Sequence, residues 1–224
     1  MMLMNSSNYS VLRSQSYQFF AGLLNQPLND LMWEELVCWA KQTGESGFLT
    51  PVKQWVNEHP GLQADGLTSL GADYTRLFIG LTKEYGPPPP FQHLYHNVCQ
   101  ENDAVASGRL AVTQCYKDSN VNPLDPYLNA SDHIVSELQY MFLLASQEAR
   151  GAELIARQNQ TFEAQLHELQ LDFLQQHLLS WVHSWNALIT RYENKFNFYS
   201  GMVTALVCFL EQDLNYLKYE LSIN

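Results

Sequence analysis

The distribution of proline and glycine divides the chain into two parts of different character. All nine prolines fall at or before Pro126, and the stretch that follows contains only two glycines, Gly151 and Gly201. Proline breaks a helix interior and glycine weakens one, so a long stretch that nearly lacks both favours long helices. We therefore expect sustained helices after Pro126, and shorter helices separated by loops before it.

The spacing of apolar residues in the C-terminal part supports this expectation. Ile134, Leu138, Met141 and Ala145 recur at intervals of three or four, which places them on one face of a helix. No stretch of the chain alternates apolar and polar residues with the period of a strand. The pattern predicts an all-α fold, a helical bundle of about ten helices with a proline-rich loop near the middle.

Length and composition limit the domain organisation. The 224 residues are 46% hydrophobic, which is enough for a substantial core and too much for a disordered chain. We expect one helical domain over residues 1–224, with a hinge at residues 117–131. A long hinge in a helical protein permits domain swapping, so both a monomer and a swapped dimer are expected forms.

Charge and cysteine usage narrow the compartment and the partners. The formal net charge is −11, and the basic residues are scattered singly, so no nucleic-acid partner is expected. The four cysteines contain no Cys-x-x-Cys pair and are typical of buried thiols in a reducing compartment. The N-terminus does not resemble a secretory signal, and no apolar run is long enough for stable membrane insertion. The expected location is the cytoplasm.

The segment "EYGPPPPFQHLYH" runs from Glu84 to His96, and its first part, residues 84–90, is the proline-rich loop. Four consecutive prolines favour a polyproline II rod, which is apolar and already low in conformational entropy. Tyr74, Leu77 and Phe78 precede the loop at helical spacing, and Phe91 follows it. These residues predict one wall of an apolar groove for a peptide, with ordinary core packing as the alternative.

A charged cluster is expected at the head of the helix that follows Ser131. Asp132 is placed to cap this helix, and His133 and Glu137 are four residues apart, so they share a face. The cluster has two interpretations. One is a helix cap with a side-chain pair, and the other is an acidic site that binds a cation such as arginine.

Motifs of enzymes and cofactors are nearly absent. The sequence has no glycine-rich phosphate loop, which leaves a GTP-binding interpretation without a motif, and it has no nucleophile elbow and no His-Glu-x-x-His. The strongest metal-like feature is His93-x-x-His96, and a metal-dependent helical hydrolase that uses these histidines with Asp132 and His133 is the alternative function. We expect a protein that is not an enzyme, without a catalytic site, metal or cofactor.

Four segments occur in an order that resembles a known family. They are "YTRLFIG", "PPPPFQHLY", "DHIVSELQYM" and "FLQQHLLSWV", followed by a final apolar helix. Together they resemble the TorD/DmsD/NarJ family of cytoplasmic chaperones for molybdenum-containing redox enzymes. The resemblance implies an all-helical chaperone that binds a twin-arginine leader peptide and the immature catalytic subunit until the molybdopterin cofactor has been inserted.

The resemblance also implies which residues bind the leader. Seven positions match those linked to leader binding, and Glu137 joins them as part of the charged cluster; the seven are Tyr74, Leu77, Phe78, Pro90, Phe91, Asp132 and His133. Asp132 is expected to meet an arginine, and the apolar residues are expected to hold the hydrophobic stretch. Where the family commonly has Trp-Glu-Ser after the prolines, this chain has Phe91-Gln92-His93. That departure removes one acidic partner for arginine.

Overall fold

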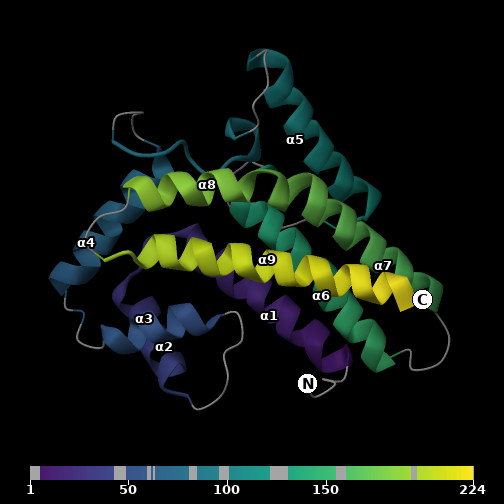
Figure 1. Ribbon diagram of the computed structural model, residues 1–224, viewed down its shortest axis with the longest axis horizontal. Coiled ribbons are helices and arrows are strands. Elements are labelled where there is room, and N and C mark those ends of the chain that lie inside the picture. Colours follow the sequence, from purple (N-terminus) through teal and green to yellow (C-terminus); the bar gives the residue numbers. More distant parts are fainter. Residues whose placement is uncertain are drawn as a thin grey trace. The chain divides into compact units, whose positions relative to one another are not determined.

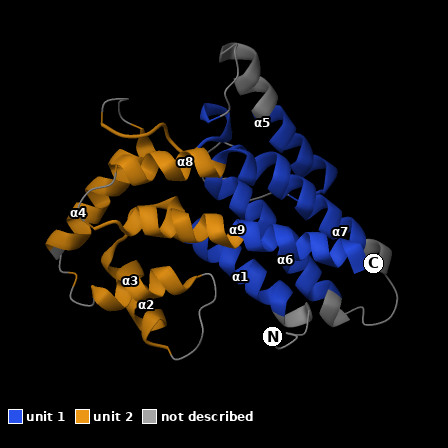
Figure 2. Cartoon of the chain, viewed as in Figure 1, with its two compact units in different colours: residues 1–22, 91–181, 210–224 blue, residues 23–90, 182–209 orange. Residues whose placement is uncertain are grey.

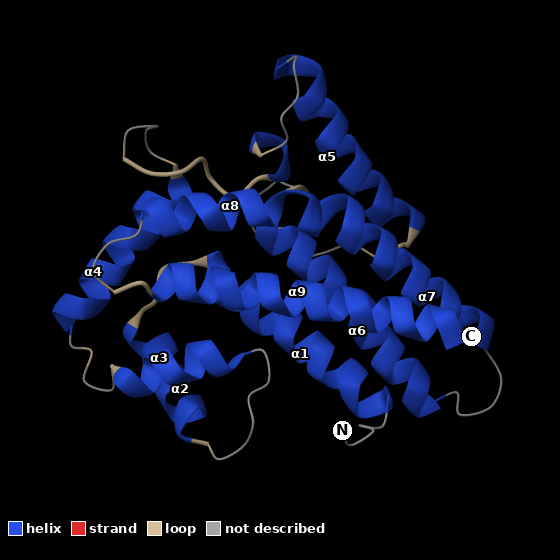
Figure 3. Cartoon of the chain, in the orientation of Figure 1, coloured by secondary structure: helices blue, strands red, loops and turns tan. Residues whose placement is uncertain are grey.

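A computed structural model of the protein describes residues 6–42, 49–59, 62, 64–80, 85–95, 101–121, 131–154, 160–192 and 196–223. Within these ranges the chain forms nine α-helices and three short helical segments, without a strand (Figure 1, Figure 3). The predicted all-α class is therefore confirmed, and the number of α-helices is slightly below the count of about ten expected for the bundle.

The helices follow one another along the chain in a single series. They are α1 (Ser6–Asn25), α2 (Asp30–Lys41), α3 (Thr50–Glu58), α4 (Ala64–Tyr74), the π-helical segment η2 (Thr75–Ile79), the 3₁₀ segment η3 (Gln92–Leu94), α5 (Glu101–Asp118), α6 (Ile134–Leu154), α7 (Gln160–Phe173), the π-helical segment η4 (Leu174–Leu178), α8 (Leu179–Tyr192) and α9 (Phe198–Ile223). None of the helices in the described part of the chain combines the length and the apolar character needed to cross a bilayer.

The chain divides into two compact units (Figure 2). Unit 1 comprises residues 1–22, 91–181 and 210–224, and unit 2 comprises residues 23–90 and 182–209. Helices α1, α8 and α9 each contribute residues to both units. The expectation of one domain over the whole chain stays a prediction. Most of the expected hinge at 117–131 lies outside the described residues.

The core of unit 1 is built on α6, which packs against α7 and η4. Ile134, Leu138, Met141 and Ala145, the predicted apolar face, are all fully buried. Buried side chains of α7 and η4, among them Phe173 and Leu174, belong to the same unit. The predicted face is therefore buried, and the first turns of α6 are buried on their other sides as well, since Val135, Ser136 and Glu137 are also fully buried.

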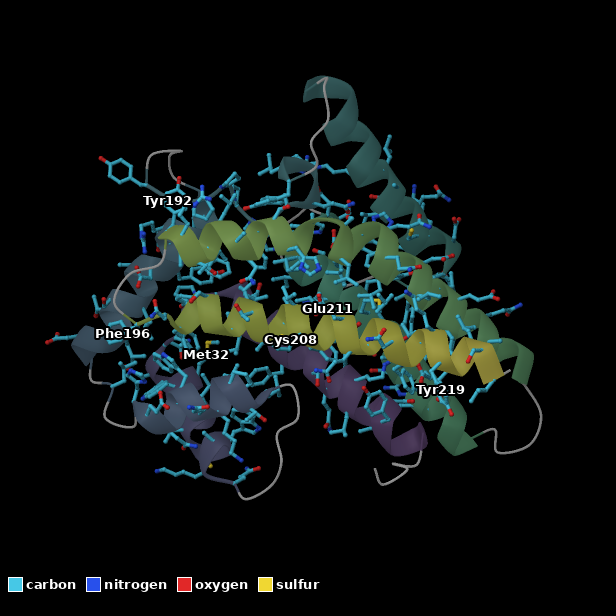
Figure 4. All side chains as sticks on the ribbon, in the orientation of Figure 1. Met32, Tyr192, Phe196, Cys208, Glu211 and Tyr219 are labelled. Atoms are coloured by element: carbon cyan, nitrogen blue, oxygen red, sulfur yellow. The ribbon has the colours of Figure 1, made fainter. Side chains whose placement is uncertain are left out.

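Unit 2 is tied together by side chains that bond to backbone carbonyls. The indole Nε1 of Trp55 donates to the carbonyl of Phe196 over 2.7 Å, and Arg76 donates to the carbonyl of Tyr192. Both carbonyl-bearing residues are labelled in Figure 4. These bonds connect η2 to the last residue of α8 and α3 to the region that follows α8, so the unit combines segments that lie far apart in the sequence.

The proline-rich loop lies directly against η2 within unit 2. Gly80 ends η2 in the left-handed conformation with φ of +66°, and a Cβ atom there would collide with the ring of Pro89. A Cβ atom on Gly86 would likewise collide with the carbonyl oxygen of Arg76. Gly80 is required because of its positive φ and the adjacent Pro89 ring, and Gly86 is required because the Arg76 carbonyl leaves no room for a Cβ atom.

The prediction that the cysteines are buried is wrong for two of them. Cys38 on α2 and Cys208 on α9 are exposed, and Cys115 on α5 is partly buried; all three are free thiols. Cys99 lies outside the described residues. Cysteine is among the residue types most often found in cores, but a thiol is small enough to be tolerated on the polar side of an amphipathic helix.

Candidate peptide-binding site

The eight residues predicted to bind a peptide are distributed over both units. Unit 2 contains Tyr74, Leu77, Phe78 and Pro90, and unit 1 contains Phe91, Asp132, His133 and Glu137. The boundary between the units falls between two adjacent members of the set, Pro90 and Phe91. The two groups have different surroundings.

The unit 2 group lies in an aromatic core. Tyr74, Leu77 and Phe78 are 3%, 0% and 4% exposed. The Tyr74 and Phe78 rings stack with centroids 4.7 Å apart, and the Phe78 ring meets the edge of Trp185 at 5.6 Å. The Tyr74 hydroxyl donates to the carbonyl of Leu24 over 3.0 Å. This packing agrees with the ordinary-core alternative, and a role in lining a peptide groove stays a prediction.

The unit 1 group is assembled by a short backbone pairing. Phe91 and His133 form an isolated antiparallel bridge, and the Gln92 amide donates to the carbonyl of Asp132 over 2.9 Å. The residues that follow the proline-rich loop thereby lie beside the start of α6. Two of the segments that carried the family resemblance are thus neighbours in space.

The carboxylate of Asp132 is the centre of this group. It is fully buried, and each of its oxygens has a partner. Oδ2 accepts from the backbone amide of His93 over 3.2 Å and pairs with Nδ1 of the same residue. Oδ1 accepts from Nε of Arg109 over 3.2 Å. A buried carboxylate needs such partners because its desolvation would otherwise be very unfavourable.

Arg109 was not among the predicted site residues. Its side chain is 42% exposed, whereas the Asp132 carboxylate that it contacts is not exposed at all. Its guanidinium carbon lies 6.0 Å from the centre of the Phe91 ring, within the range of a cation–π contact. The site in unit 1 therefore holds a guanidinium between a carboxylate and an aromatic ring, and this guanidinium comes from the chain itself.

The predicted cap and side-chain pair at the head of α6 require correction. Nδ1 of His133 accepts from the Val135 amide over 3.2 Å, so His133, rather than Asp132, supplies the side-chain acceptor at the helix start. Because Nδ1 accepts, the neutral ring carries its proton on Nε2. The carboxylate of Glu137, expected to pair with His133, accepts instead from Nε1 of Trp181 over 3.2 Å.

Glu137 is an unusual carboxyl group. It is fully buried, and its Oε1 has no hydrogen-bond partner among the described residues. Burial raises its pKa well above the ordinary value; the bond from Trp181 opposes this shift, and the negative charge of Asp132 adds to it. Burial thus shifts Glu137 towards its protonated form.

Gln92, where the family commonly has an acid, belongs to a separate buried chain of hydrogen bonds. Nδ1 of His177 donates to its side-chain oxygen over 3.1 Å, and Nε2 of His177 lies 3.5 Å from the sulfur of Cys115. His177 belongs to η4, the π-helical segment of unit 1. The amide at position 92 thus has a packing role in this chain.

The metal-dependent alternative finds no support in the described ranges. Among these residues, no group of three or more His, Cys, Asp and Glu side chains is arranged to hold a metal ion. His93 pairs with Asp132, and His133 caps α6. His96, the other member of the His-x-x-His motif, lies outside the described residues.

Comparison with known proteins gives a consistent result. Residues 44–187 match a family model described as nitrate reductase delta subunit. The chain is similar to the chaperone protein TorD of Aliivibrio salmonicida, with 25% identity over 161 residues that cover 70% of this chain and 67% of the relative. It is also similar to the chaperone protein TorD of Aliivibrio fischeri, with 26% identity over the same shares. No solved structure matches the chain.

The matched region includes the whole candidate site. It contains all eight predicted residues as well as Arg109 and His93. Both curated relatives are chaperones by name, in agreement with the expectation that the protein is not an enzyme.

Proposed function

The chain belongs to the nitrate reductase delta subunit family, and from this membership we propose that it is a maturation chaperone for a molybdopterin-containing oxidoreductase. In this role it binds the twin-arginine leader peptide and the immature catalytic subunit in the cytoplasm, and it delays export until the cofactor has been inserted. The curated relatives, both chaperones by name, support the general role.

The observation that carries leader binding is the way Asp132 is partnered. Its buried carboxylate accepts from the Nε of Arg109, whose guanidinium lies over the Phe91 ring. A carboxylate beside an aromatic face suits a guanidinium because it combines a charge-assisted hydrogen bond with a cation–π contact. We propose that an arginine of the leader binds at the same carboxylate.

The hydrophobic stretch of the leader needs apolar surface next to this site. Leu94 on η3 and Leu110 on α5 are 42% and 67% exposed, and the two segments pack against each other within unit 1. Leu94 and Leu110 directly follow His93 and Arg109 in the sequence, and we propose that they offer such a surface. The proposal also includes the four buried residues of unit 2, which are Tyr74, Leu77, Phe78 and Pro90. Because they are buried, the effect of a substitution on stability and its effect on peptide affinity must be measured separately.

Calorimetric titration with a panel of twin-arginine leader peptides tests the proposal. Each peptide is compared with a version in which both arginines are glutamine, and we expect this change to weaken binding by about tenfold or more. Asp132→Asn is expected to weaken binding of the arginine peptide by about tenfold and to leave the affinity for the glutamine peptide unchanged. The difference should shrink at high salt because mobile ions screen the charges.

Asp172→Asn is the matched control for this titration. Asp172 lies in the same unit and is exposed, and the variant changes the net charge by the same amount. Thermal melts show whether each variant is folded. A folded Asp132→Asn protein that binds the arginine peptide as tightly as wild type would remove Asp132 from the site. Light scattering on the same samples distinguishes a monomer from a dimer.

A further inference from the structure

We propose that Arg109 is an internal competitor for the guanidinium site, so that a peptide arginine binds Asp132 only after Arg109 has been displaced. This inference rests on the proposed function, because it concerns the same carboxylate. It adds a regulatory element that neither the family match nor the relatives' names assign.

Both oxygens of the Asp132 carboxylate are already occupied. Oδ2 faces His93, which holds it through both the backbone amide and the ring nitrogen. Oδ1 faces Arg109. A second guanidinium at Oδ1 would stand directly beside the first, and two like charges at this distance repel each other. An incoming arginine therefore has to replace one of the two partners.

Arg109 is the partner that can leave. The His93 side chain is 7% exposed and is anchored by its own backbone amide, whereas the Arg109 side chain is 42% exposed. Arg109 reaches the carboxylate with its Nε, as a long side chain from the surface of α5. Ion pairs with an exposed partner are weak, and a long side chain regains rotamer freedom on release.

The aromatic ring of Phe91 does not depend on Arg109 for its position. The ring centre lies 6.0 Å from the guanidinium carbon of Arg109 and 4.9 Å from the centre of the His133 ring. The backbone of Phe91 pairs with that of His133. Release of Arg109 would leave both the ring and Oδ1 available. The surroundings of Arg109 are thus the binding elements that the proposed function assigns to a peptide arginine.

The competition has a measurable consequence. The apparent affinity of a site that is only partly open is reduced by the fraction that is open. Arg109→Gln removes the internal guanidinium, and we expect it to tighten binding of the twin-arginine leader peptide about fivefold. The glutamine version of the peptide should bind no more tightly to this variant than to wild type, since it does not use the carboxylate.

Arg150→Gln is the matched control. Arg150 lies in unit 1, is exposed, and changes the net charge by the same amount when replaced. Any general gain in attraction for a basic peptide appears equally in both variants. We expect the arginine peptide to prefer Arg109→Gln over Arg150→Gln, with both proteins titrated at the same salt concentration.

A second variant is needed in case Arg109→Gln does not fold, because that change leaves Asp132 with one partner fewer. Arg109→Lys keeps the positive charge but replaces the planar group with a point charge. We expect a smaller gain in affinity, about twofold, again only for the arginine peptide. Thermal melts identify which variant is folded, and the affinity of the folded variant for the arginine peptide is the result that tests the competition.

The outcomes separate the two proposals. Tighter binding of the arginine peptide to the folded Arg109 variant, relative to the Arg150 control, supports the competition. Equal or weaker binding overturns it, while the proposed function stands if wild type still prefers the arginine peptide. If no variant distinguishes the arginine peptide from the glutamine peptide, the proposed function fails and the competition fails with it.

Discussion

Arg13 and Asp213, 200 positions apart in the sequence, form an ion pair that is fully buried within unit 1. Arg13 also donates to Glu148 over 2.6 Å and to Gln170 over 2.7 Å. Its guanidinium lies 4.7 Å from the centre of the Tyr216 ring. A single arginine thereby connects α1, α6, α7 and α9, and two buried carboxylates share its positive charge.

Replacement of Arg13 is expected to destabilise the protein strongly. Arg13→Met fills part of the same volume but leaves the carboxylates of Glu148 and Asp213 buried without their cation. We expect the free energy of unfolding to fall by about 3–5 kcal/mol, the usual effect of removing one partner of a buried pair. Urea unfolding followed by circular dichroism measures this change. Arg150→Met, at an exposed position, is the control and should shift stability by about 0.5 kcal/mol or less.

The same network makes the stability of the protein depend on pH, through the carboxyl group of Glu148. Burial alone raises the pKa of Glu148, but the charge of Arg13 and the contacts with His167 and Ser10 outweigh burial and hold the pKa well below its usual value. A depressed pKa means that the ionised group stabilises the fold above the pKa of the unfolded chain, about 4.3. This contribution is lost as the pH falls below that value.

Glu148→Gln should therefore be most destabilising at neutral pH, and its effect should shrink between about pH 5 and pH 3. Urea midpoints of wild type and variant at neutral pH and at several acidic values across this range provide the test. Glu168→Gln, an exposed change in the same unit, should show a small difference that does not vary with pH in this way. An effect of Glu148→Gln that grows on acidification would contradict the depressed pKa.

Periodicity and helix-breaking residues predicted most of the fold because they act locally. The face of α6 that carries Ile134 and Leu138 was predicted correctly from spacing alone. The π-helical segments η2 and η4 were not predicted. A π-helical turn inserts one residue and rotates the faces that follow, and the sequences at Thr75–Ile79 and Leu174–Leu178 carry no local signal for it.

Helix α1 shows why the polar core was also missed. It buries Ser10, Arg13, Ser14 and Tyr17, which recur at the spacing of one helical face. In the sequence this stripe is typical of a solvated surface, because charged and hydroxyl side chains are mostly exposed. Its burial depends on Asp213 and Glu148, which come from helices far away along the chain. No local pattern indicates such partners.

The candidate site shows the same contrast between local patterns and distant partners. The family resemblance assigned Phe91 and Asp132 to one site, and the structure brings their segments together at a backbone bridge in unit 1. Sequence reasoning did not find the Arg109 partner of Asp132, because Arg109 has no distinguishing local motif. Its position is set by the register of α5 against η3.

Glu137 is expected to be a source of instability at neutral pH. Burial raises its pKa well above the ordinary value, so the folded state retains a proton that the unfolded chain releases above about pH 4.3. The folded protein therefore incurs no penalty from Glu137 below that pH. As the pH rises above it, the unfolded state is favoured because it can release the proton, and the free energy of unfolding falls. Glu137→Gln resembles the protonated form and still accepts from Trp181.

The variant should therefore be more stable than wild type at neutral pH, by on the order of 1 kcal/mol, and nearly equal to it at about pH 4. Urea unfolding at the two values measures the difference, with Glu168→Gln again as the exposed control. Destabilisation at neutral pH would mean that the carboxylate is ionised and satisfied in the folded protein.

Leu77 and Ile79 provide a matched pair within η2. Leu77 is fully buried, whereas Ile79 is 50% exposed. Leu77→Ala is expected to lower the free energy of unfolding by about 2–5 kcal/mol, and Ile79→Ala by about 1 kcal/mol or less. Leader affinity measured well below both melting temperatures then separates contact from packing. If Leu77→Ala remains folded and binds as wild type, its role is confined to the core.

The close approach of the proline-rich loop to η2 gives a prediction that depends on backbone alone. A Cβ atom at Gly86 would collide with the carbonyl oxygen of Arg76, which is backbone and cannot move aside as a flexible side chain can. Gly86→Ala is therefore expected to lower the free energy of unfolding by about 1–3 kcal/mol. Gly151 lies in α6, and a Cβ atom added there would meet nothing within 4 Å, so Gly151→Ala should raise stability by about 0.5–1 kcal/mol.

Thermal melts of the two glycine variants, compared with wild type, measure these opposite shifts. The contrast matters because both substitutions add the same methyl group, and both reduce the freedom of the unfolded chain. Opposite shifts of the two variants come from the folded state, where Gly86 meets the Arg76 carbonyl and Gly151 meets open space. If Gly86→Ala were as stable as Gly151→Ala, the loop would not lie against η2, and the proline segment could not help to shape the surface beside it.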